Sequence, residues 1–148
     1  MFKAVKKLIS AVFPQKNSAQ RILQSFEGQR QQLRDDFFAK AATSGKPRGL
    51  IWKNCTWLDT FTLVEESSTG IHTLFCGVNL SFEAVEGGDM EDVEAVSLIR
   101  EGSAVFHHQN GRWGSGGRVL FNMDPQMAAQ TMATGQVSVA HSSTETKP

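Results

Sequence analysis

The densest group of reactive side chains in this sequence is a run of carboxylates around Gly87-Gly88. Six acidic residues fall within twelve positions there: Glu83, Glu86, Asp89, Glu91, Asp92 and Glu94. Carboxylate oxygens suit a hard cation, but an EF-hand loop needs acidic residues at alternating positions followed by glycine, and that spacing is absent. Charge runs are usually solvated, so we interpret the segment as an exposed acidic loop, with docking on a basic helix as the alternative. We predict no metal site.

The histidines are not spaced as a chelating set. His107 and His108 are adjacent in a strand-like segment, so their side chains should point to opposite faces of a sheet. His72 and His141 are isolated in the sequence. No pair has the usual spacing of zinc ligands.

The two cysteines do not form a recognisable motif either. Cys55 and Cys76 are 21 positions apart, which fits no metal or redox pattern. Cys76 beside a histidine would make a nucleophile pair, but no flanking signature accompanies it. We predict reduced, buried thiols, no cofactor and no assigned catalytic residue.

Three tryptophans are the strongest candidates for a binding surface. Large aromatic side chains in short strands usually belong to the core. Near charged side chains they can also line a ligand pocket in a curved sheet. The predicted ligand-binding residues are Trp52, Trp57, Glu83, Arg112 and Trp113.

A glycine-rich stretch, Gly114-Ser115-Gly116-Gly117, interrupts a strand-like segment. Its amides could face a phosphate group. It lacks the Lys-Ser/Thr of a P-loop and does not clearly open a helix. We interpret it as a bulge or a widened loop.

Helical periodicity dominates the first third of the chain. A stripe of five apolar residues predicts one helix over residues 19–43, ended by Gly45 and Pro47. The stripe consists of Ile22, Phe26, Leu33, Phe37 and Ala41. A shorter amphipathic segment, residues 1–17, precedes the helix and contains Pro14.

Strand patterns follow from Gly49 onward, separated by turn clusters. Asn110-Gly111 is a strong signal for a tight hairpin, because both positions tolerate positive φ. Asp124-Pro125 marks the start of a short C-terminal helix. Residues 136–148 have few apolar groups and predict a disordered tail.

This order of elements predicts an α+β protein with one domain over residues 18–135. A long N-terminal helix should pack on a curved antiparallel sheet of about four to six strands, followed by the short C-terminal helix. Such a shape is cystatin-like or nuclear-transport-factor-2-like, a comparison of shape that carries no function.

The charge is distributed unevenly, although the formal net charge is zero. Residues 1–53 hold eleven basic and three acidic residues, whereas residues 54–148 hold four basic and twelve acidic ones. The two halves are expected to neutralise each other by packing. The apolar run near the N-terminus is too short for an export signal or a transmembrane segment, so we predict a cytoplasmic protein.

Several segments together resemble a family of small uncharacterised bacterial proteins found mainly in planctomycetes. The resemblance covers roughly residues 47–127. It is carried by residues 81–96, Gly49-Leu50-Ile51-Trp52, Trp57, Ala104-Val105-Phe106, Gly111-Arg112-Trp113 and residues 117–122. It implies a bacterial domain of unknown function and brings no catalytic residues with it.

The sequence favours a non-enzymatic binding or protein-interaction domain that uses the concave face of the sheet for an unknown protein or small molecule. A homodimer is possible. One alternative is a small enzyme with its site in the sheet cavity and candidates Glu83, His72 and His107. The other is peripheral membrane or nucleic-acid binding through the basic N-terminal helices, with nucleic acid the less favoured partner. A deep pocket holding a carboxylate and a histidine within hydrogen-bond reach would favour the enzyme.

Overall fold

The computed structural model describes residues 14–44, 47–88, 91, 93, 99–132 and 136–142. The chain forms two compact units, Met1–Arg30 and Gln31–Pro148. The first contains helix α2 (Pro14–Gly28), and Pro14 suits a first helical position because its missing N–H would have no partner there. All further elements lie in the second unit, except that helix α3 (Arg30–Ala42) starts one residue before it.

The single helix predicted over residues 19–43 is not found as one element. It is divided into α2 and α3, with Gln29 as a turn residue between them. Glycine costs about 1 kcal/mol relative to alanine inside a helix, so α2 ends at Gly28, where the helix propensity is lowest. The apolar stripe from Ile22 to Ala41 continues past Gly28, so the periodicity did not reveal the break.

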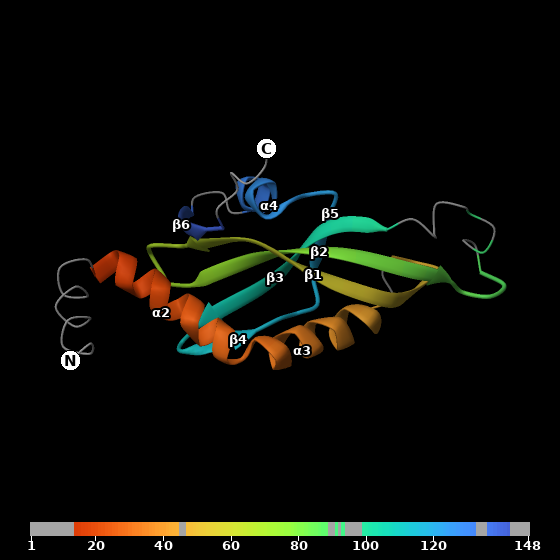
Figure 1. Ribbon diagram of the computed structural model, residues 1–148, viewed down its shortest axis with the longest axis horizontal. Helices are drawn as coiled ribbons and strands as arrows, with labels where there is room; N and C mark the ends of the chain where they lie inside the picture. The colour runs from red at the N-terminus through yellow and green to blue at the C-terminus, as the bar shows by residue number, and fades with distance from the viewer. Residues whose placement is uncertain are drawn as a thin grey trace. The chain divides into compact units, whose positions relative to one another are not determined.

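The second unit is built on an open antiparallel sheet that has six strands among the described residues. They are β1 (Leu50–Glu65), β2 (His72–Ala84), β3 (Arg100–Gln109), β4 (Arg112–Gly114), β5 (Val119–Phe121) and β6 (Val137–His141). The order is β4-β3-β2-β1-β6, and β5 also pairs with β3 (Figure 1). The α+β class with an antiparallel sheet is thus confirmed.

Local turn and cap signals are confirmed at both predicted places. Asn110 and Gly111 have φ of 55° and 78° in the tight turn between β3 and β4. Helix α4 (Pro125–Met132) begins after Asp124, whose Oδ1 accepts a hydrogen bond of 2.8 Å from the Met127 amide.

The glycine-rich stretch separates β4 from β5, as a widened loop. Both short strands pair with β3, and between them the Arg118 carbonyl accepts from the Val105 amide. The Ser115 hydroxyl donates to the Val105 carbonyl at 3.3 Å and accepts from the Gly117 amide at 3.0 Å. The glycine-rich loop is therefore hydrogen-bonded to strand β3.

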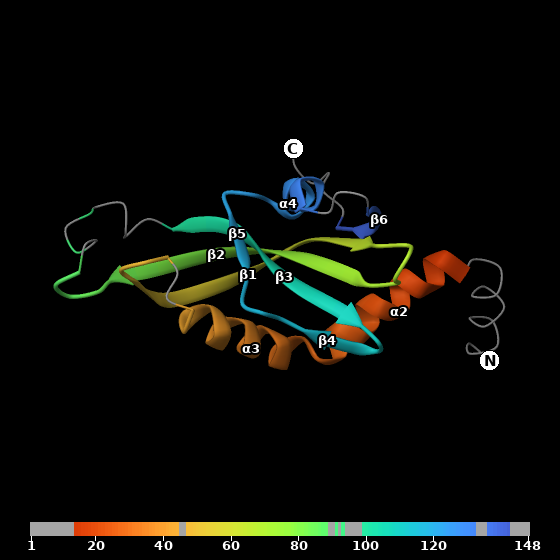
Figure 2. The same cartoon turned by 180° about the vertical axis from the view of Figure 1, so that it is seen from behind.

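Helix α3 covers one face of the sheet and α4 covers the other (Figures 1 and 2). On the α3 side, the fully buried Phe37 ring lies 5.4 Å from Trp57, 6.1 Å from Trp52 and 5.9 Å from Phe106 between ring centroids. On the α4 side, a second core cluster consists of Val64, Phe75, Val105, Ala128 and Ala129. Neighbouring strand residues such as Val105 and Phe106 alternate between the two cores.

The C-terminal segment differs from its prediction. Residues 137–141 form strand β6, which pairs with β1 from Thr62 to Glu65, where a disordered tail was predicted. Val137, Ser138 and Val139 alternate apolar and polar residues as a strand does, a pattern concealed by the polar composition of residues 136–148 as a whole, and the edge of β1 supplies the hydrogen-bond partners. Residues 143–148 lie outside the described residues, as do residues 1–13 and the acidic Asp89, Asp92 and Glu94.

Candidate functional site

Strand β1 has one fully paired side and one partly open side. Along its whole length it pairs with β2, from Leu50 opposite Ala84 to Glu65 opposite His72. On its other side, β6 covers only Thr62 to Glu65 among the residues that the structure describes. Within the part of the chain that the structure describes, residues 50–59 of β1 therefore form a sheet edge.

A groove of about 420 Å³ lies beside this edge, between β1 and helix α3. The helix contributes Gln31, Arg34, Asp35, Phe38 and Ala39, and the strand contributes Lys53, Asn54, Cys55 and Trp57. All nine residues belong to the unit Gln31–Pro148. The lining of the groove mixes aromatic, charged, amide and thiol groups.

The central feature of the groove is an arginine stacked on a tryptophan. The Arg34 guanidinium carbon lies 4.7 Å from the Trp57 ring centroid, within the range of a cation–π interaction. Trp57 is half-buried and held edge-on by Phe37 at 5.4 Å. The stacked pair thus presents a positive charge on a ring that the core keeps in place.

Two other charged side chains line the groove, Asp35 on the helix and Lys53 on the strand. The Asp35 carboxylate accepts a hydrogen bond of 3.0 Å from the Gln31 amide nitrogen. Lys53 is exposed on the strand side. The groove lining thus carries two cations, Arg34 and Lys53, and one carboxylate, Asp35.

Cys55 lines the groove but is a poor nucleophile. Burial raises the pKa of its thiol to about 12, although the Arg34 charge acts in the opposite direction. Near neutral pH the side chain is therefore a protonated thiol, and only the thiolate attacks electrophiles or binds metals.

A second group of polar residues forms a row across four strands. Register places Glu65 of β1 opposite His72 of β2, His72 opposite His108 of β3, and His108 opposite Trp113 of β4. Ring centroids are 6.2 Å apart for the two histidines and 5.1 Å apart for His108 and Trp113. We call these four residues the histidine row.

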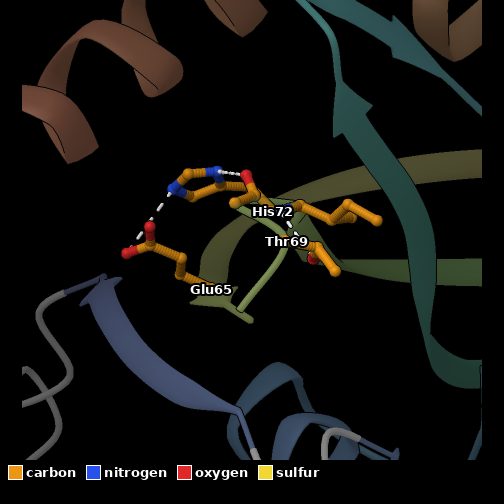
Figure 3. A network of polar contacts seen from close by, with 5 residues as sticks. Glu65, Thr69 and His72 are labelled. Carbon is orange, nitrogen blue, oxygen red and sulfur yellow. Dashed lines mark hydrogen bonds and ion pairs between the residues drawn. The ribbon is translucent and has the colours of Figure 1, made fainter. Parts of the chain in front are cut away.

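Within the histidine row, His72 is oriented by the turn that joins β1 to β2 (Figure 3). His72 Nδ1 lies 3.0 Å from the Gly70 carbonyl, and because a carbonyl only accepts, this nitrogen carries the proton. His72 Nε2 then faces Glu65 Oε1 at 4.0 Å, which is longer than a hydrogen bond. The Thr69 hydroxyl closes the turn by accepting from the Ile71 amide at 3.2 Å.

The two adjacent histidines of β3 have lowered pKa values for different local reasons. Burial lowers the pKa of His108, and the neighbouring His72 lowers it further. Burial and then Arg118 lower the pKa of His107, whose Nδ1 lies 3.2 Å from the Thr73 hydroxyl on the opposite face. Both rings are neutral at pH 7. In the part of the chain that the structure describes, no three His, Cys, Asp or Glu side chains are placed to hold a metal ion.

The five predicted ligand-binding residues do not form one site. Trp52 is buried in the core beneath Phe37 and Phe38, whereas Trp57 lines the groove. Trp113 is buried beside His108 in the histidine row.

Glu83 and Arg112 are exposed and lie far apart. Glu83 pairs with Ile51 near one end of β2, and Arg112 pairs with Gln109 beyond the other end. Only Trp52 and Trp57 come together, through their shared contact with Phe37. Sequence reasoning missed Arg34, which gave no signal beyond its place on a polar helix face.

Comparison with known proteins gives no relative for this chain: no family model, no curated protein and no solved structure matches it. The resemblance to planctomycete proteins and the cystatin-like or nuclear-transport-factor-2-like shape therefore stay predictions. Among the described residues, no helix is long and apolar enough to cross a membrane.

Proposed function

We propose that this chain is a non-enzymatic binding domain whose ligand lies in the groove between α3 and the open edge of β1. The observation that carries the proposal is the Arg34–Trp57 stack at 4.7 Å, held in place by Phe37 beside strand β1. An aromatic ring with a fixed cation is a frequent anchor of binding surfaces.

The groove replaces the concave sheet face as the proposed site. Helix α3 lies on the face that carries Trp52 and Trp57, and α4 packs on the other. A ligand on either central face would have to displace a helix from a buried core, whereas the groove is open without rearrangement.

An enzyme is the second candidate, supported by the histidine row. A general base needs hydrogen-bond reach to its orienting partner, roughly 2.6–3.2 Å. The contact between Glu65 and His72 is longer, at 4.0 Å, and neither residue lines the groove. The thiol of Cys55, which does line it, is protonated. The geometry supports binding better than catalysis.

The test is a screen of the full chain by proton–nitrogen NMR against a panel of small aromatic carboxylates and short peptides. We expect saturable shift changes at amides of residues 34–39 and 53–57. Arg34→Gln and Trp57→Leu should weaken binding severalfold. The control variants Arg118→Gln and Phe121→Leu, at and beside β5 rather than in the groove lining, should leave it unchanged.

Two results would contradict the proposal. One is saturable binding with shift changes centred on Glu65, His72 and His108. That result would favour the enzyme over the binding domain. The other is the absence of any shift in the groove amides with the whole panel, which would remove the groove as a ligand site.

A further inference from the structure

We infer that the protein has a second ligand site, a small cavity between β1 and the start of α4 that takes a primary ammonium group on a short alkyl chain. The cavity has a volume of about 70 Å³. Residues 60–62 of β1 form one wall, residues 124–126 form another, and Ser142 lies at the side. All of these residues belong to the unit Gln31–Pro148, and none lines the groove, so the inference is independent of the proposed function.

The observation that points to a ligand is the hydroxyl group of Thr62. This residue is 2% exposed, and its Oγ1 has no hydrogen-bond partner among the residues that the structure describes. Thr62 and Val64 share one face of β1, because side chains alternate along a strand, and Val64 belongs to the core cluster of Ala128 and Ala129 in α4. The Thr62 side chain therefore points to the α4 side of the sheet, into the cavity that it lines. A buried hydroxyl without a partner costs free energy, which a ligand that pairs with it would recover.

The other hydroxyl at the side of the cavity, that of Ser142, is engaged with β1. Its Oγ accepts a hydrogen bond of 3.0 Å from the Phe61 amide and donates one of 3.3 Å to the Phe61 carbonyl. The Ser142 amide donates to the same carbonyl at 2.9 Å. These three contacts fix the side of the cavity, and the Thr62 hydroxyl is the group at its buried end that a ligand would meet.

The charge of the cavity favours a cation. Asp124 is exposed and is the one charged residue among the described lining residues. Its Oδ1 accepts the cap hydrogen bond of 2.8 Å from the Met127 amide, but a carboxylate has about four acceptor positions, so others serve a ligand. The N-terminus of a helix favours an anion, but the Asp124 carboxylate already fills that role and would repel a second one.

The size and the apolar walls of the cavity define the rest of the ligand. A volume of about 70 Å³ exceeds the roughly 10–15 Å³ that one water molecule needs, but it is far below that of a pocket for a drug-sized molecule. Phe61 and Pro125 supply apolar surface for methylene groups. An ammonium group has three N–H donors, which suit the Thr62 hydroxyl and the Asp124 carboxylate together. A free alkylamine and the lysine side chain of a peptide both have this chemistry.

The experiment titrates the full chain with three four-carbon probes of equal length: n-butylammonium, 1-butanol and butyrate. Binding is followed at constant ionic strength by NMR shifts of the amides of residues 60–62 and 126–128. We expect n-butylammonium to bind about fivefold more tightly than 1-butanol, since charge-assisted hydrogen bonds are about twice as strong as neutral ones, and butyrate not to bind. A capped lysine and its norleucine counterpart then separate the two sources. Binding of the capped lysine would assign the site to a peptide side chain, and binding of n-butylammonium alone would assign it to free amines.

Two conservative variants connect the effect to the cavity. Asp124→Asn keeps an oxygen that can cap α4 but removes the charge, so the affinity for n-butylammonium should fall to that for 1-butanol. Thr62→Val removes the hydroxyl at nearly constant shape. It should weaken n-butylammonium binding severalfold, while the variant without ligand melts no lower than the wild type, because an unpaired buried hydroxyl is gone. The matched controls Asp36→Asn and Thr56→Val, at exposed positions outside the cavity, should leave binding unchanged.

Three results would overturn the inference. Equal affinities for n-butylammonium and 1-butanol would remove the ammonium group as the ligand. Saturable binding of butyrate alone would identify an anion site at the start of α4. No shift changes at residues 60–62 with any probe, together with a lower melting temperature of Thr62→Val, would mean that the hydroxyl pairs with a bound water molecule only. Each of these results leaves the groove and its proposed function untouched.

Discussion

Gly117 lies so close to the backbone of Ala41 that no other residue fits between the glycine-rich loop and the end of α3. A Cβ added at Gly117 would lie 2.6 Å from the Ala41 nitrogen and 2.8 Å from the Lys40 carbonyl carbon. Its φ of 81° is in the left-handed region that favours glycine. Beside this contact, Lys40 Nζ donates to the Ser115 carbonyl at 2.8 Å, so the loop and the helix are joined at two points.

Replacement of Gly117 by alanine should therefore destabilise the protein by roughly 2 kcal/mol or more, from positive-φ strain together with the overlap with α3. The matched control is Gly116→Ala, because nothing lies within 4 Å of a Cβ there. Denaturant melts of the two variants would measure the difference. Equal free energies of unfolding for both variants would show that the loop moves away from α3 at little cost.

Truncation of Phe37 to alanine should cost roughly 3–5 kcal/mol, because its side chain is fully buried among aromatic rings. Phe38→Ala removes the same atoms from a half-buried position and should cost clearly less. Thermal melts by circular dichroism would compare them. A Phe37→Ala variant as stable as the wild type would mean that α3 is not anchored on the sheet by this ring.

The Cys55 thiol should react slowly with a thiol reagent at pH 8, because burial raises its pKa to about 12 and the thiolate is the reactive form. In a Cys76→Ala background, Cys55 is the single thiol of the chain. Arg34→Gln should slow the reaction further, since the Arg34 charge lowers the pKa of the thiol. The same variant unfolded in denaturant should react at the rate of a free cysteine. Fast labelling of the folded protein would contradict the raised pKa of the Cys55 thiol.

The two histidines of β3 should make the protein less stable in mild acid. Their pKa values in the fold lie below the ordinary 6.5, so the unfolded chain binds protons more tightly. Their contribution to stability is complete above pH 6.5 and is lost as the pH falls from 6.5 toward the lowered values. His72→Gln should raise the pKa of His108 alone, and Arg118→Gln that of His107 alone, which ring-proton NMR titrations would separate. Midpoints at or above 6.5 for both rings in the wild type would refute this account.

Local signals in the sequence were sufficient for many elements of the fold. The Asn110-Gly111 turn and the cap at Asp124 are confirmed, because each depends on the conformational freedom or hydrogen bonding of the residues themselves. The α+β class followed from the order of helical and strand patterns. Phe37 was correctly expected in the core, because helical spacing alone places it on the apolar stripe.

Two parts of the chain differ from prediction: the first long helical pattern and the C-terminal segment. Gly28 divides the first long helical pattern, where a propensity cost of about 1 kcal/mol outweighs a continuing apolar stripe. Residues 137–141 form β6 because their Val-Ser-Val alternation suits a strand and β1 offers backbone partners, although the segment lies in a mostly polar stretch.

The candidate sites depend on contacts that no local pattern encodes. Arg34 and Trp57 are 23 positions apart and meet only because α3 packs on the sheet beside β1. Glu65, His72, His108 and Trp113 become one row only through the register of four strands. A slip of one residue in any pairing would turn the partner side chain to the other face. The sequence alone therefore determined which residue types were present and which local elements they form, whereas strand register and helix docking decided which of them meet, because those depend on the packing of the whole second unit.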